Sequence, residues 1–122
     1  MSRRFHLYDH EATRRWLVSQ AALRRSAEKE MDDMDALVYW AKDAFDNSDK
    51  SILVRNRFTT LYDSYQLQMN RFSFDLSAFI SDPSRSYLEK HAIMHDVIQK
   101  LRNLANRIVR IAEVQLIPTR IG

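Results

Sequence analysis

The most restrictive feature of this sequence is its lack of internal glycine, since the single glycine is Gly122. Hairpin turns and nucleotide-binding loops depend on glycine where φ must be positive or where the backbone approaches a phosphate closely. Long α-helices have no such requirement. The sequence therefore predicts an all-α protein, and its 122 residues correspond to one domain.

Two short polar segments divide the chain into three long runs. Residues 46–49 (Asp-Asn-Ser-Asp) are of the types that favour turns and caps over helix interiors. In the second segment, residues 81–84, Asp82 suits a helix N-cap and Pro83 suits the first helical turn. Pro118 follows the third run. We therefore expect helices over residues 10–45, 49–80 and 83–116.

Apolar residues recur at three- and four-residue steps in all three runs, a pattern typical of helices with one buried face. The predicted core of the first run consists of Trp16, Leu17, Leu23, Ala27, Met31, Met34, Leu37, Val38, Ala41 and Phe45. That of the second consists of Val54, Phe58, Leu61, Tyr62, Tyr65, Met69, Phe72, Leu76 and Phe79. That of the third consists of Met94, Val97, Ile98, Leu101, Leu104, Ala105, Ile108, Ile111 and Ala112.

Because the connections between these runs are short, neighbouring helices must run antiparallel. The sequence predicts an up-down-up bundle of three long helices, which pairing with a second copy would complete into a larger bundle. Helices 1 and 3 are then parallel. The acidic second half of helix 1 would then lie beside the basic second half of helix 3 and could pair with it. The acidic residues are Glu28, Glu30, Asp32, Asp33, Asp35 and Asp43, and the basic ones are Lys100, Arg102, Arg107 and Arg110.

The overall charge and apolar content narrow the function classes. A net charge of +3 is mildly basic, below the charge density of a dedicated nucleic-acid packaging protein. No run approaches the roughly 20 apolar residues of a membrane span. No apolar stretch follows Arg3 and Arg4, so we expect no secretory signal and a cytoplasmic location. The absence of cysteine excludes disulfides and thiolate chemistry.

A second apolar column predicts an interaction surface. Leu53, Leu67 and Phe74 fall roughly 160–200° from the core column of the second run. Tyr39 and Trp40 lie off the core stripe of the first run. Isolated exposed apolar residues are common, but aromatic residues at interface centres often dominate binding energy. We expect these five residues to bind a second copy or another protein, as in a non-catalytic adaptor, assembly subunit or regulatory partner.

The basic start of the first helix suggests an alternative, a small nucleic-acid-binding subunit. Arg14 and Arg25 are eleven residues apart and share a helix face, and Arg15 and Arg24 lie next to them. Arginine is well suited to bidentate phosphate contacts. The neighbouring Trp16 falls on the predicted core stripe, where it could not stack on a base. A solvated basic face is the plainer interpretation.

Two other patterns, the paired histidines and the spacing of Arg85 and His91, predict neither a cofactor nor an active site. His6/His10 and His91/His95 have the four-residue spacing from which some zinc sites are built, but no Glu follows His91 as in an HExxH site. Arg85 and His91 are a few residues apart, as in helical ribonucleases of the HEPN type. That spacing arises easily by chance in an arginine-rich chain and does not amount to a family resemblance. A ribonuclease ranks third among the functions.

Overall fold

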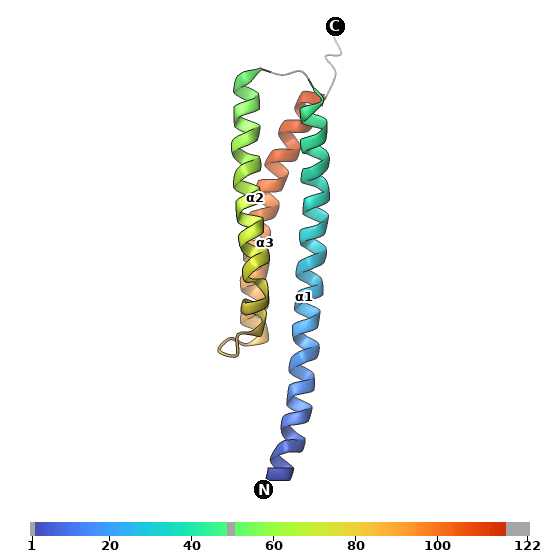
Figure 1. Ribbon diagram of the computed structural model, residues 1–122, viewed down its shortest axis with the longest axis vertical. Coiled ribbons are helices and arrows are strands. Elements are labelled where there is room, and N and C mark those ends of the chain that lie inside the picture. The colour runs from blue at the N-terminus through green and yellow to red at the C-terminus, as the bar shows by residue number, and fades with distance from the viewer. Residues whose placement is uncertain (1, 49–50, 117–122) are drawn as a thin grey trace.

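The computed structural model describes residues 2–48 and 51–116, and the side chains of residues 11–48 and 51–113. It contains three helices, α1 (Ser2–Asp46), α2 (Ile52–Ser81) and α3 (Tyr87–Leu116). α1 and α3 run in one direction and α2 runs in the other, and the described ranges contain no strand (Figure 1). The predicted three-helix bundle is confirmed.

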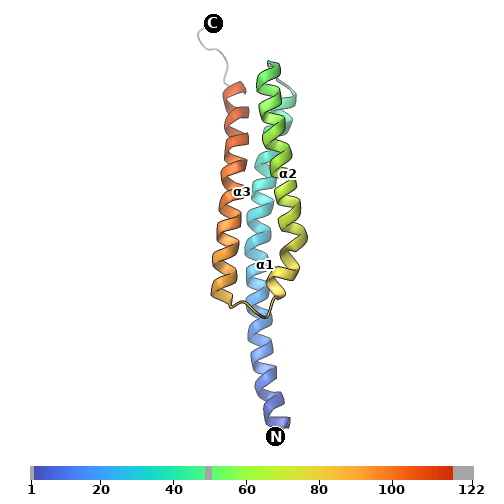
Figure 2. The ribbon, with the colours of Figure 1, turned by 90° about the vertical axis from the view of Figure 1, so that its left-hand side faces the viewer.

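Helix α1 is much longer than its two partners. It has 45 residues against 30 in each of the others, which corresponds to about 68 Å against about 45 Å. It begins at Ser2, not near residue 10 as the sequence predicted. Its first part therefore extends beyond the connection between α2 and α3 (Figures 1 and 2).

The predicted start of the third helix is wrong by four residues. Asp82 caps the C-terminal end of α2, and its Oδ1 accepts hydrogen bonds from the Ser84 N–H (2.9 Å) and the Ser84 hydroxyl (2.7 Å). These bonds hold the pKa of Asp82 below its usual value. The true N-terminal cap is Ser86, whose Oγ accepts from the Glu89 N–H at 3.2 Å and donates to the Glu89 carboxylate. The Ser86 oxygen thus satisfies one of the free N–H groups of the first turn, and α3 begins at Tyr87.

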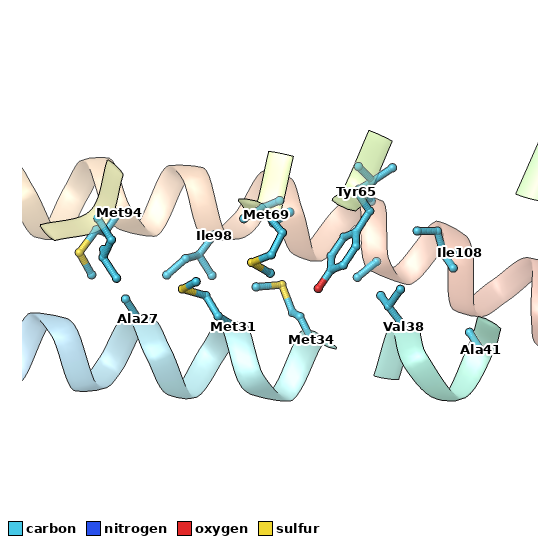
Figure 3. Close-up of a cluster of buried hydrophobic side chains, with 14 of the residues drawn as sticks. Ala27, Met31, Met34, Val38, Ala41, Tyr65, Met69, Met94, Ile98 and Ile108 are labelled. Atoms are coloured by element: carbon cyan, nitrogen blue, oxygen red, sulfur yellow. The ribbon is translucent and has the colours of Figure 1, made fainter. Parts of the chain in front are cut away.

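The core lies along the bundle axis. Figure 3 shows Met31, Met34 and Met69 meeting between α1 and α2, with Tyr65 beside them. The buried apolar side chains are Leu23, Ala27, Met31, Met34, Val38, Ala41, Phe45, Phe58, Tyr65, Met69, Leu76, Ile80, Met94, Ile98, Leu101, Leu104, Ala105, Ile108 and Ala112. Most of the predicted core residues are among them.

Three predicted core residues of α1 are exposed instead: Trp16, Leu17 and Leu37. Trp16 lies on the same face as Leu23, but α2 ends at Ser81 and α3 begins at Tyr87, so the bundle ends at that level. Leu17 is about 100° farther round the helix. Leu37 is likewise about 100° from Val38, and only Val38 points into the core.

The core face of α2 is rotated slightly from the predicted one. Met69 and Ile80 are fully buried, whereas Phe72 and Phe79, which the sequence predicts in the core, are half-buried. Phe72 lies about 60° round the helix from Met69. The two phenylalanines thus lie at the edge of the core, on the side of α2 that meets α3.

Helices α1 and α3 are joined by one ion pair between described side chains, Glu30 with Arg102. The predicted proximity of the acidic half of α1 and the basic half of α3 is therefore correct at this point. The remaining ion pairs between described side chains join residues three or four positions apart, such as Lys29 with Asp33. They support individual helices more than the bundle register.

Candidate functional site

Three of the five predicted interface residues lie on the outer face of α2. Leu53, Leu67 and Phe74 are 78%, 57% and 86% exposed. The spacing of 14 and then 7 residues separates them by about 21 Å and 10 Å along the helix. Thr60 lies in the gap, and its hydroxyl donates to the Asn56 carbonyl at 2.9 Å. The α2 outer face is therefore a column of separate apolar side chains interrupted by polar ones.

The other two predicted interface residues, Tyr39 and Trp40, are exposed on α1. Being consecutive, they point about 100° apart. Trp40 has the exposed Leu37 three residues before it, on the same side of the helix. The five predicted residues are thus distributed over two helices, and Trp40 with Leu37 forms a smaller apolar surface of its own.

A groove between α2 and α3 was not identified from the sequence. It has a volume of about 340 Å³. Its lining is mainly apolar and consists of Gln68, Arg71, Phe72, Asp75, Leu76, Phe79, Ile93, Met94, Val97, Lys100 and Leu101. Sequence reasoning placed Phe72, Phe79 and Val97 in the core and did not consider Ile93. The available signal was that these four positions widen the apolar stripes beyond what the core of three helices can cover.

Of the four arginines at the basic start of α1, Arg24 bonds to α2, whereas the other three are exposed. Arg24 donates to the Ser77 hydroxyl of α2 at 2.9 Å and lies 3.6 Å from the Glu28 carboxylate. Arg14 and Arg15 line an open hollow of about 530 Å³ between α1 and the start of α3. Arg15 also pairs with Glu11 within α1 at 3.3 Å. Arg25 is exposed.

The aromatic residues near this hollow are accessible. Tyr87 lines the hollow, and Trp16 is 41% exposed rather than buried in the core. The Trp16 ring lies 5.9 Å from Nζ of Lys90. Arginines and accessible rings therefore occur together at this end of the bundle.

Lys90 is a buried cation that sequence reasoning missed. Its side chain is only 2% exposed, and its ammonium group donates a hydrogen bond to the Ile80 carbonyl at 2.5 Å. That carbonyl belongs to the last turn of α2, where the helix dipole is negative. The sequence carried one signal, since Lys90 stands four residues before Met94 on the core stripe of α3. Its contacts join the first turns of α3 to the last turn of α2 and to Trp16 in the body of α1.

Tyr65 supplies a second polar contact across the core. Its hydroxyl donates to Oδ1 of Asp35 at 2.6 Å, and Figure 3 shows the ring pointing from α2 toward α1. Burial of the ring, followed by the hydrogen bond to Asp35, raises the pKa of Tyr65 well above its ordinary value. The phenol is therefore neutral at neutral pH and acts as a hydrogen-bond donor to Asp35.

Among the described side chains, Arg85 and His91 have separate contacts and do not form one cluster. Arg85 lies before α3, 3.4 Å from the Asp82 carboxylate and over the Phe79 ring. His91 lies inside α3 with its ring 6.1 Å from that of Tyr87. The side chains of Arg3, Arg4, His6 and His10 lie outside the described residues.

The described side chains include no group of three or more His, Cys, Asp or Glu residues that would hold a metal ion. No helix within the described ranges is long and apolar enough to cross a membrane. No family model matches the chain, and no curated protein and no solved structure is significantly similar to it.

Proposed function

We propose that this chain is a non-catalytic helical interaction protein, such as an adaptor, an assembly subunit or a regulatory partner. It acts by burying the α2 outer face against a second copy or another protein. The observation that carries this proposal is the exposure of Leu53, Leu67 and Phe74 on the helix whose opposite face fills the core.

The energetic argument rests on the apolar area left in water. Fully burying a leucine or phenylalanine side chain stabilises an assembly by about 1.5–3 kcal/mol. Phe74 and Leu67 are two turns apart, close enough to enter one partner surface. Aromatic residues of this kind commonly dominate the binding energy of an interface.

We expect Leu67→Asp to abolish association through the α2 outer face while the helix content is retained. An aspartate at the centre of an apolar contact would have to be desolvated without a partner, which costs several kcal/mol. Leu67 is already exposed, so the fold itself loses little packing. Light scattering coupled to size exclusion measures self-association, and capture experiments measure binding to other proteins. Circular dichroism measures the helix content.

Asp63→Ala is the matched control, because it changes a charge four residues away and removes no apolar area. It should leave association unchanged. An assembled mass and a capture of other proteins that both equal those of the wild type in the Leu67→Asp variant would refute the α2 outer face as the interface.

A second candidate function is single-stranded nucleic-acid binding at the basic end of α1. It is favoured by one observation, that Arg14, Arg15 and Tyr87 line a single hollow near the accessible Trp16 ring. Arginines would contact phosphates, and bases would stack on the rings.

We expect Arg14→Ala with Arg15→Ala to weaken oligonucleotide binding about tenfold or more at low salt, as loss of two phosphate contacts requires. The same change should reduce the salt dependence of the affinity. Arg24→Ala is the control, because Arg24 is already engaged with Ser77 and Glu28. Fluorescence anisotropy with a labelled single strand measures both effects, and an absence of wild-type binding at low salt would dismiss this candidate.

A further inference from the structure

The α2–α3 groove belongs to an apolar strip that runs along most of the bundle. On α2, Leu61, Phe72 and Phe79 are half-buried and, at spacings of 11 and 18 residues, lie within about 20° of one another. On α3, the half-buried Ile93 and Ile111 are 18 residues apart and lie in one column. Figure 2 shows α2 and α3 flanking the more distant α1, so this strip lies away from α1. It resembles the inner face of a bundle that lacks further helices.

Three charged side chains, Arg71, Asp75 and Lys100, line the groove, and Asp96 lies beside it as the ion-pair partner of Lys100. Arg71 and Asp75 are one turn apart on α2, and both line the groove. Asp96 and Lys100 are one turn apart on α3, and Nζ of Lys100 lies 3.3 Å from the Asp96 carboxylate. All four residues are exposed.

The antiparallel course of α2 and α3 brings like charges to the same level. The hydrogen bond between Lys90 and the Ile80 carbonyl marks one level common to the two helices. Arg71 is nine residues before Ile80 and Lys100 is ten residues after Lys90, so both lie about 14 Å from that level. By the same count the two aspartates lie about 8 Å from it. The groove therefore has a basic level (Arg71 and Lys100) next to an acidic level (Asp75 and Asp96), near its middle.

We propose that the α2–α3 groove binds a second copy of this chain in an antiparallel, two-fold symmetric dimer. This inference rests on the proposed function and names the partner and a second surface. The two-fold axis lies in the plane of the interface and crosses the helices between the basic and acidic levels. Each basic level then faces the partner's acidic level, and the apolar side chains that line the groove, such as Phe72 and Val97, are covered by those of the partner. Leu61 and Ile111, about 28 Å and 32 Å from the Lys90 level, lie beyond the partner's α2 and α3.

The charge pattern selects this arrangement over a parallel one. With the axis along the helices, each basic level would face the other copy's basic level, which is unfavourable. In the antiparallel arrangement all four charges of each copy find opposite charges. Such charge complementarity sets the orientation of the two copies and the choice of partner. The apolar side chains that line the groove supply most of the free energy of association.

A charge-exchange experiment tests the proposal. The first variant, Arg71→Glu with Lys100→Glu, makes both levels acidic, and the second, Asp75→Lys with Asp96→Lys, makes both basic. All chains carry Leu67→Asp in addition, so that association through the α2 outer face does not contribute to the mass. Light scattering at about 100 μM protein, in the range where a weak dimer forms, should then give twice the 14.5 kDa chain mass when the four groove charges are unaltered. Each variant alone should give the single-chain mass, since like charges now face each other across the interface. An equimolar mixture of the two should recover the dimer mass.

Recovery in the mixture would also show that both variants are folded. Where a double substitution lowers the helix content measured by circular dichroism, the single substitutions Arg71→Glu and Asp75→Lys give a milder form of the same test. A chain with unaltered groove charges that is monomeric at about 100 μM, variants that stay dimeric alone, or a mixture that stays monomeric would each overturn the proposal.

The outcome is separable from that of the α2 outer face. Charge exchange that succeeds while Leu67→Asp has no effect would keep the groove dimer and refute the outer-face interface. The reverse pattern would refute the groove dimer and keep the outer-face interface.

Discussion

Phe58→Ala should lower the free energy of unfolding by about 3–5 kcal/mol, the usual cost of removing a buried phenylalanine ring. Phe58 is fully buried in α2, and its ring stacks on that of Phe45 in α1 with centroids 4.0 Å apart. The centroid of the Tyr62 ring lies 6.2 Å from that of Phe58. Truncation would remove these contacts and leave a cavity between α1 and α2. Urea denaturation followed by circular dichroism measures the loss.

Phe74→Ala is the matched control, because it makes the same chemical change in the same helix at an exposed position. It should alter the free energy of unfolding by no more than about 0.5 kcal/mol. If the α2 outer face is an interface, this variant should weaken association instead. Equal destabilisation by the two substitutions would contradict the burial pattern of α2.

Lys90→Ala should cost about 2–4 kcal/mol of unfolding free energy, because it leaves a buried carbonyl without its donor and removes buried methylene groups. The carbonyl is that of Ile80, and the lost ammonium group is also the cation that lies over the Trp16 ring. Lys90→Met should cost less than Lys90→Ala, since it restores most of the apolar volume without the hydrogen bond.

Lys29→Ala provides the comparison, because Lys29 is exposed and pairs only with Asp33 one turn away. Its effect should stay within about 0.5 kcal/mol. Urea denaturation of the three variants under the same conditions gives the ranking. A cost for Lys90→Ala no larger than that for Lys29→Ala would show that the buried lysine does not hold the helix ends together.

Helix formation and the main core columns could be predicted from the sequence. Met34, Val38 and Ala41 follow the three- and four-residue steps of an amphipathic helix, and all three are buried. This works because helical periodicity is local: the direction of each side chain follows from its position along one helix. Short connections then require antiparallel neighbours.

The start of α3 could also have been found in the sequence, but two local signals competed. Asp82 and Pro83 form one plausible helix start, and Ser86 with Glu89 forms another. The helix starts at the second signal because the Ser86 hydroxyl oxygen accepts a hydrogen bond from the Glu89 N–H, a free group of the first turn. Asp82 instead accepts from the Ser84 N–H in the preceding turn.

The candidate surfaces were predictable only in part. The exposure of Leu53, Leu67 and Phe74 follows from their helix angle, which the sequence supplies. The groove does not, because Phe72 and Phe79 lie within the predicted apolar stripe. Their partial exposure depends on how many helices pack against α2.

The helices, the polar breaks between them and the apolar face of each helix can all be predicted from the residues alone. Which parts of those apolar faces are covered depends on how the three helices pack against one another. Trp16 continues the column of Leu23 yet is exposed, and Lys90 continues the column of Met94 yet is buried. The physical reason is that burial depends on which helix end lies opposite, a relation between residues far apart in the chain that the helical repeat does not encode.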